Sequence, residues 1–170
     1  ILDAIPAPEG DPDGDTQVLI STIDYNEYVG RIGVGKVERG TISVNQELML
    51  LNHHDPDKHE RVKISKLYEF DGLNKVEVKS ATIGAIVAIS GIADIHIGDT
   101  LCAGDNPESI PFQKISEPTI SMNFLVNDSP LAGQEGKYIT SRHLRDRLYR
   151  ELNTDVSLRV EETDSTDSFK

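Results

Sequence analysis

The stretch VGRIGVGKVERGTI, residues 29–42, decides how the first half of the chain is interpreted. From Gly30 it has the spacing of the phosphate-binding loop GxxxxGK[ST], but Val37 stands where that loop needs a hydroxyl to ligate magnesium. The following residues, ERGTISVNQELML, contain β-branched side chains and no apolar stripe at helical spacing. Because a phosphate loop joins a strand to a helix N-terminus, we interpret these glycines as points where a strand bends or another backbone packs close.

Short β-rich runs separated by Gly, Asn and Asp continue on both sides of this stretch. They are VLISTIDY, VGRIGVGKVERG, TISVNQELMLL, ERVKISKLYEF, VEVK and AIVAIS. Closely spaced strands without helices between them favour an antiparallel barrel or sandwich. We therefore expect a mainly β chain, with a barrel over residues 17–112 and a Pro-, Gly- and acid-rich linker over residues 1–16.

The pattern changes after a second linker, residues 113–118. TISMNFLV, residues 119–126, alternates apolar and polar side chains and predicts a half-buried strand, as does VSLRVEE, residues 156–162. SRHLRDRLYRELN lies between them and predicts a helix with Ser141 as its N-cap. The apolar stripe of this helix consists of Leu144, Leu148 and Leu152. One helix and two strands over residues 119–170 give an α+β unit with a thin core.

The composition limits the classes of function. With 27% charged residues and no run of 18 apolar ones, the chain predicts a soluble protein without a membrane span. Cys102 is the only cysteine, which excludes an intramolecular disulfide and fits a reducing cytoplasm. The net charge of -12 opposes indiscriminate coating of nucleic acid. The first residues show neither a signal peptide nor an initiator Met, so we expect a piece of a longer protein.

Three histidines, His53, His54 and His59, raise the alternative of a metal site. No cysteine or carboxylate stands at a convincing ligand spacing, so we expect a polar hairpin tip and no metal.

Several segments resemble the translational GTPases of the elongation-factor superfamily. GRIGVGKVERGTISVNQEL and ATIGAIVAISGIADIHIGDTLC are similar to the second-domain β-barrel of these proteins. IDYNEYVG, SLRVEETDSTDSFK and EPTISMNFLVNDSPLAGQEGKYITSRHLRDRL resemble the TypA/BipA family of ribosome-associated GTPases in particular. The resemblance implies a translation-factor-type antiparallel β-barrel (domain II) followed by an incomplete ferredoxin-like β-α-β unit (the first half of domain III).

This resemblance also implies a function in translation, ribosome assembly and stress adaptation. The chain contains no GxxxxGK[ST] or NKxD motif, so we expect it to be non-catalytic, with GTP and Mg²⁺ belonging to a G domain outside it. In the family the two strands at residues 119–126 and 156–161 flank a third strand. We therefore expect a unit that is mobile, mispaired or completed by another copy of the chain through its unpaired strand edges.

Ribosomal RNA and ribosomal proteins are the expected partners, together with the G domain and C-terminal domains of the full-length protein and without a membrane. The candidate contact residues are Arg31, Lys36, Arg39, Lys137, Arg142, Arg145, Arg147 and Arg150. The helical arginines are equally compatible with a solvated helix face. Two other functions stay open: a nucleotide-binding enzyme that uses residues 30–36, and an interaction or metal-binding module that uses the hairpin histidines.

Overall fold

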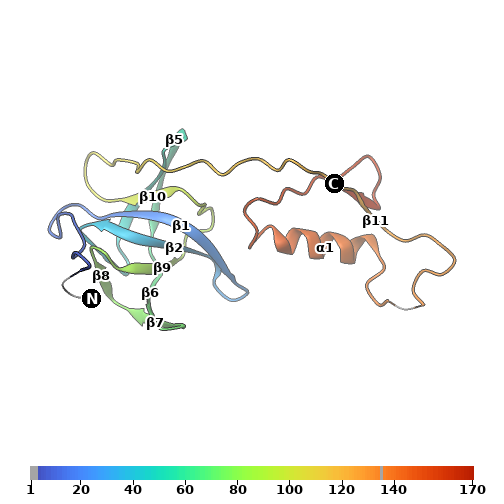
Figure 1. Cartoon of the computed structure of the whole chain (residues 1–170), viewed down its shortest axis with the longest axis horizontal. Helices are drawn as coiled ribbons and strands as arrows, with labels where there is room; N and C mark the ends of the chain where they lie inside the picture. The colour runs from blue at the N-terminus through green and yellow to red at the C-terminus, as the bar shows by residue number, and fades with distance from the viewer. Residues whose placement is uncertain (1–3, 135) are drawn as a thin grey trace. The chain divides into compact units, whose positions relative to one another are not determined.

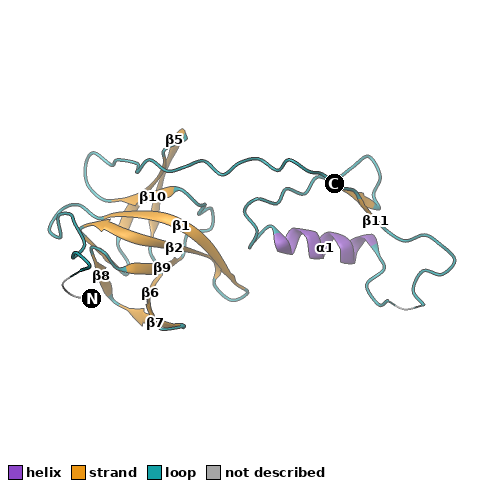
Figure 2. Ribbon diagram, in the orientation of Figure 1, coloured by secondary structure: helices purple, strands orange, loops and turns teal. Residues whose placement is uncertain are grey.

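The computed structural model describes residues 4–134 and 136–170, which form two compact units, Ile1–Lys114 (unit 1) and Ile115–Lys170 (unit 2). Unit 1 is built from antiparallel strands (Figures 1 and 2). These strands are β1 (Gln17–Asn26), β2 (Gly30–Arg39), β3 (Thr41–Ser43), β4 (Glu47–Asn52), β5 (Asp55–Lys63), β6 (Lys66–Asp71), β7 (Asn74–Val78), β8 (Ser80–Thr82), β9 (Ile86–Ser90) and β10 (Asp99–Cys102).

Eight of these strands form one sheet in the order β5-β4-β10-β1-β2-β9-β6-β7, and β3 pairs with β8. Only Ile64 and Ser65 connect β5, at one edge, to β6, near the other edge. The sheet must therefore curl until its two ends approach, and the Ser65 amide donates to the Ser90 carbonyl at 3.0 Å. No ladder joins β5 to β6 or β7 among the described residues, so the predicted mainly β antiparallel fold is confirmed but closure of the barrel is not.

The core of unit 1 fills the inside of the curled sheet. Its wholly buried side chains include Val18, Ile20, Leu50, Ile89 and Leu101. In β1 the buried residues alternate with more exposed neighbours, whereas in β9 and β10 successive residues are buried. Burial on both sides of these two strands shows that unit 1 covers them with further chain on their outer face.

Gly30, Gly33 and Gly35 of the opening stretch lie in β2, as interpreted from the sequence. A Cβ on Gly35 would overlap the Leu19 carbonyl oxygen on the neighbouring strand, and one on Gly33 would overlap the Ile95 side chain. The chain then enters β3, a strand, so the amide cradle at a helix N-terminus that a phosphate loop uses is not formed here.

Unit 2 contains the helix α1 (Ser141–Glu151) and two short strands, β11 (Phe124–Leu125) and β12 (Ser168–Phe169). The predicted strand over residues 119–126 is therefore limited to two residues, and the one predicted over residues 156–162 is wrong. The C-terminal residues explain both differences. Lys170 forms two backbone hydrogen bonds with Glu161, and the neighbouring strand β12 pairs with β11.

The N-cap of α1 is Thr140, so the prediction of Ser141 is wrong by one residue. Thr140 has an extended backbone (φ -95°, ψ 154°), and its side chain accepts a hydrogen bond from the His143 amide. The predicted apolar stripe does turn inward, but its leucines are only half-buried. Among the described residues of unit 2, the fully buried ones are Ser168 and Phe169, which confirms the thin core.

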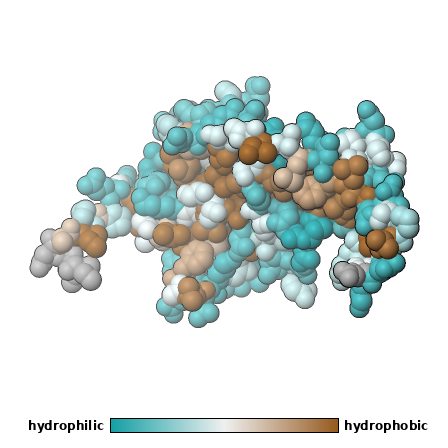
Figure 3. Space-filling view, turned by 45° about the vertical axis from the view of Figure 1, so that its right-hand side comes forward, coloured by the Kyte–Doolittle hydropathy of each residue, from teal (hydrophilic) through white to brown (hydrophobic). Residues whose placement is uncertain are grey.

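A groove of about 580 Å³ separates the extended segments on the two sides of unit 2. Its lining includes Ile120, Met122 and Phe124 from one side, Leu158 from the other and Leu148 from the helix. Large apolar side chains in this unit, such as Ile120 at 81% exposure, reach the solvent, and hydrophobic surface is visible in Figure 3. Beside this groove, Phe169 pairs with Phe124 of β11 on one side and with Glu162 on the other, so the C-terminal residues lie between the two segments and the expected empty slot is wrong at this point.

Candidate functional site

The three candidate cations of β2 do not gather on one surface. The Arg31 guanidinium donates to the Ile95 carbonyl at 3.4 Å, and its Nη1 lies 3.3 Å from His96 Nε2. Lys36 forms an ion pair with Glu38 at 2.8 Å. Because Arg31 and Lys36 are five residues apart, a strand points their side chains to opposite faces.

Arg39 serves the structure of unit 1. Its Nε donates to the Asp15 carbonyl at 2.9 Å, and the Gly40 amide donates to the Asp11 carbonyl at 2.9 Å. These contacts fasten the acidic N-terminal segment to the end of β2. The guanidinium is therefore partly occupied by the chain's own backbone.

The arginines of α1 are far more exposed. Arg142, Arg145 and Arg147 have side-chain exposures of 88%, 57% and 65%. Each has a carboxylate partner: Asp146 at 4.0 Å for Arg142, Glu162 at 2.7 Å for Arg145, and Glu151 for Arg147. Exposed pairs of this kind contribute about 0–1 kcal/mol each, so the guanidinium groups can exchange these partners for others at little cost.

The helical arginines occupy two faces of α1. Arg142 and Arg145 are three residues apart and lie on one face, where Arg145 also lies 5.5 Å from the centre of the Tyr149 ring. Arg147 and Arg150 are likewise three apart and form a second pair around the helix. Lys137 is exposed in the loop before the helix. The structure thus brings the candidate residues of unit 2 into two pairs and leaves Lys137 outside both.

A buried ionic cluster holds the β4–β5 hairpin and is not apparent in the sequence. The carboxylate of Asp99, which is fully buried, accepts from Lys58 Nζ at 2.9 Å, Asn52 Nδ2 at 2.8 Å and the His96 amide at 2.8 Å. Nothing in the local pattern around Lys58 marks it as the partner of a residue 41 positions later. The cluster is structural, because every carboxylate contact is made within unit 1.

The hairpin histidines are placed by packing. His53 and His54 form the turn between β4 and β5, and His54 Nε2 lies 2.9 Å from the Phe112 carbonyl oxygen. His59 lies within β5, which begins at Asp55, so the tip is shorter than the predicted residues 53–60. Across residues 4–134 and 136–170, no group of three or more His, Cys, Asp or Glu side chains is arranged to hold a metal ion.

Hydropathy adds one further observation. No helix in the described part of the chain combines the length and the apolar character that are needed to span a membrane.

Comparison with known proteins identifies relatives over the whole length of the chain. The chain is 47% identical to the large ribosomal subunit assembly factor BipA of Synechocystis sp., over 99% of the chain and 28% of that protein. It is 45% identical to BipA of Bacillus subtilis and 44% identical to BipA of Escherichia coli K12, over 27% and 28% of those proteins. The chain thus spans little more than a quarter of the length of these curated relatives.

Structural comparison supports the fold. The crystal structure of a Thermus thermophilus protein matches 92% of the chain with a TM-score of 0.62 at 20% sequence identity, and the match covers 22% of that protein. The family of elongation factor Tu domain 2 matches residues 30–102, which run from the start of β2 to the end of β10. The chain therefore belongs to the BipA family, and its residues 30–102 form an elongation factor Tu domain 2.

Proposed function

We propose that this chain is the non-catalytic, ribosome-contacting part of a BipA-type translational GTPase, and that it relays the nucleotide state of a G domain to the ribosome. The identity of 44–47% with proteins named large ribosomal subunit assembly factors carries the proposal. In this assignment residues 17–112 are the domain II barrel, residues 119–170 are the first half of domain III, and residues 1–16 and 113–118 are linkers.

The exposed arginines of α1 are the proposed contacts with ribosomal RNA in unit 2. Arginine offers bidentate hydrogen bonds to phosphate, and within the described residues Arg142 and Arg147 are held by weak surface ion pairs. In unit 1 Lys36 is the first candidate for contact with ribosomal RNA, because Arg31 and Arg39 already bind backbone carbonyls. Such a local positive surface stands out electrostatically against the acidic chain.

GTP hydrolysis, with its GTP and Mg²⁺, is proposed for a G domain of the full-length protein. The glycine stretch supports this division, because it is a β-strand and neighbouring atoms crowd Gly33 and Gly35. A calorimetric titration of the chain with GTP and Mg²⁺ should give no heat of binding. A saturable heat would instead favour the nucleotide-binding enzyme. The proposed setting is translation, ribosome assembly and stress adaptation in the cytoplasm.

Cosedimentation with purified ribosomes across a salt series tests the proposal. We expect binding at low salt that weakens steeply as salt rises, since phosphate contacts release counterions. The variant Arg142→Gln/Arg145→Gln should bind more weakly. Its control is Arg159→Gln/Lys170→Gln, with the same charge change at exposed residues of unit 2 outside α1. Absence of binding by the unmodified chain at low salt would remove the ribosome-contact function.

Self-association is proposed only for the groove of unit 2. The groove and its exposed apolar lining support association with another copy of the chain, and in the full-length protein the other domains would occupy the groove instead. Sedimentation velocity over a concentration series would detect it, and a strictly monomeric chain would contradict it.

A further inference from the structure

The outer face of β5 carries cations that the sequence interpretation did not assign to any function. β5 lies at an edge of the sheet, paired only with β4 among the described strands. The register places Val62 opposite Leu48, which is 3% exposed, so these side chains face the core. Arg61 and Lys63 are the neighbours on either side of Val62 and therefore point outward. They lie about 6.8 Å apart along the strand.

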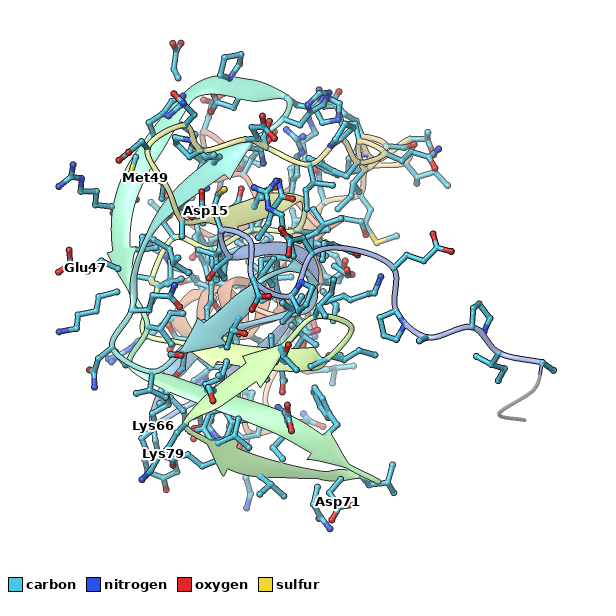
Figure 4. The ribbon with its side chains drawn as sticks, turned by 90° about the vertical axis from the view of Figure 1, so that its left-hand side faces the viewer. Asp15, Glu47, Met49, Lys66, Asp71 and Lys79 are labelled. Carbon is cyan, nitrogen blue, oxygen red and sulfur yellow. The ribbon has the colours of Figure 1, made fainter. Side chains whose placement is uncertain are left out.

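Two further lysines lie close along the chain or across a ladder: Lys66 begins β6, directly after the short connection from β5, and Lys79 follows β7. Continuing the register of β6 and β7 by one pair places Lys66 opposite Lys79. The Lys79 carbonyl accepts from the Val44 amide, and the Ile64 carbonyl, next to Lys63, accepts from the Asn45 amide. The turn that contains Val44 and Asn45 thus holds the segment around Lys63 next to the segment around Lys79. Figure 4 shows Glu47, Met49, Lys66 and Lys79 along one side of unit 1, and Glu47 and Met49 are the register partners of Lys63 and Arg61. We call Arg61, Lys63, Lys66 and Lys79 the basic edge.

Three of these four cations have no partner within the described residues, where Arg61, Lys63 and Lys79 make no side-chain hydrogen bond or ion pair. Lys66 pairs with Glu77 at 3.2 Å, in a contact where both side chains are about half exposed. The carboxylate closest in register is that of Glu47, opposite Lys63. In a chain with 29 acidic residues and 17 Lys and Arg, neighbouring cations left without carboxylates are unexpected unless something else uses them.

We propose that the basic edge binds the phosphate backbone of RNA. Several cations that follow one another along an edge match a line of phosphates, which needs positive charge and little else. An acidic protein partner is less well matched, because protein interfaces draw most of their affinity from buried aromatic or aliphatic anchors and all four positions here are cations. The proposal rests on the proposed function and deepens it, since it assigns RNA contact in unit 1 to the basic edge, a set of cations distinct from Lys36.

Edge protection is the competing explanation, because charged residues also prevent a free strand from pairing with another chain. The two explanations separate experimentally. Cations that only protect the edge would leave RNA affinity unchanged on neutralisation, and the variant would self-associate. Cations that bind phosphate would alter the salt dependence of RNA binding.

The test measures binding of the full chain to a fluorescently labelled RNA duplex by anisotropy over a salt series. Arg61→Gln/Lys63→Gln should reduce the slope of log K against log salt by about two. Between about 50 and about 200 mM salt, the unmodified chain should then lose about tenfold more affinity than the variant. The control Lys75→Gln/Lys114→Gln changes the charge equally at exposed residues of unit 1 and should keep the slope.

A second variant is expected to increase RNA affinity, so its result cannot be explained by misfolding. Glu47→Gln removes the carboxylate opposite Lys63 and should strengthen RNA binding at low salt. Retention of the thermal transition by all variants establishes that they fold. Equal slopes for Arg61→Gln/Lys63→Gln and its control would overturn the proposal, as would polyglutamate that displaces the RNA as efficiently as an unlabelled duplex does.

Ribosome cosedimentation of the same proteins separates this inference from the proposed function. If the unmodified chain binds ribosomes and the basic-edge variant binds equally well, the basic edge is not a contact and the proposed function stands. If the unmodified chain does not bind ribosomes at all, the proposed function fails, and the basic-edge proposal fails with it.

Discussion

Lys58 and Asp99 form an ion pair of 2.9 Å between residues 41 positions apart, and the Asp99 carboxylate is fully buried. The pair joins the edge strand β5 to the start of β10, with β4 between them. Because β5 has no ladder on its other side among the described strands, this pair fixes the position of the strand that carries Arg61 and Lys63 of the basic edge.

The first prediction follows from this burial. Lys58→Met should lower the free energy of unfolding by about 3 kcal/mol, because it leaves a buried carboxylate without its counterion. Urea denaturation of the full chain measures the change. Lys36→Met is the control: its pair with Glu38 is exposed and should be worth less than about 1 kcal/mol. Equal small losses of unfolding free energy in Lys58→Met and Lys36→Met would show that the buried pair does not stabilise the fold.

The second prediction concerns the close approach at β2. Gly35→Ala should cost about 3 kcal/mol or more, because the added Cβ overlaps the Leu19 carbonyl oxygen and neither backbone can move without breaking the ladder. Gly72→Ala has open space and bears only the cost of its positive φ of 60°, about 1 kcal/mol. Thermal melts of both variants provide the comparison, and a Gly35→Ala protein as stable as Gly72→Ala would contradict the packing.

The third prediction concerns pH. A hydrogen bond from Lys75 holds the pKa of Asp24 below its ordinary value of 3.8. A carboxyl whose pKa is lowered by folding stabilises the protein above its ordinary pKa and loses this contribution as the pH falls through the folded value. Lys75→Met should therefore raise the pKa of Asp24 in an NMR titration, while Lys36→Met leaves it in place. An Asp24 titration that is the same in all three proteins would show that the pair is not formed.

The fourth prediction tests the start of α1. Thr140→Ala should destabilise the helix by about 1 kcal/mol, because the His143 amide loses its acceptor. Ser141→Ala, at the position that the sequence favoured as the cap, should change little. Circular dichroism at 222 nm over a temperature series compares the two. A larger loss for Ser141→Ala would restore the sequence-based assignment.

Local patterns were sufficient for much of unit 1. The runs around Gly33 and Gly35 have the alternation and turn residues of short strands, and the missing hydroxyl at Val37 already excluded a phosphate loop. Such features depend on residues within one strand or turn, so they can be recognised without knowing the fold. The same holds for the stripe of leucines in α1, whose period of four residues is a property of the helix itself.

Patterns failed where pairing was decided at long range. The segment at residues 156–162 alternates like a strand, yet only its end meets the chain's C-terminus, where β12 pairs with β11 and bridges to Glu162. In unit 2 the core is too thin to impose a register, so the strands that form depend on which partners are present. Thr140 became the cap because the backbone, and not the residue type alone, decides which hydroxyl faces the first amides.

The sequence by itself determined the β-rich class of unit 1, the role of its glycines and the family, because these depend on local spacing and on matched residues along the chain. Only the tertiary structure decided which cations are free. Arg31 and Arg39 looked available in sequence and are bound to backbone carbonyls, whereas Arg61 and Lys63 are exposed and, within the described residues, without partners. The reason is physical: whether a charge is neutralised depends on what the fold brings within a few ångströms of it, and that is set by strand order and register.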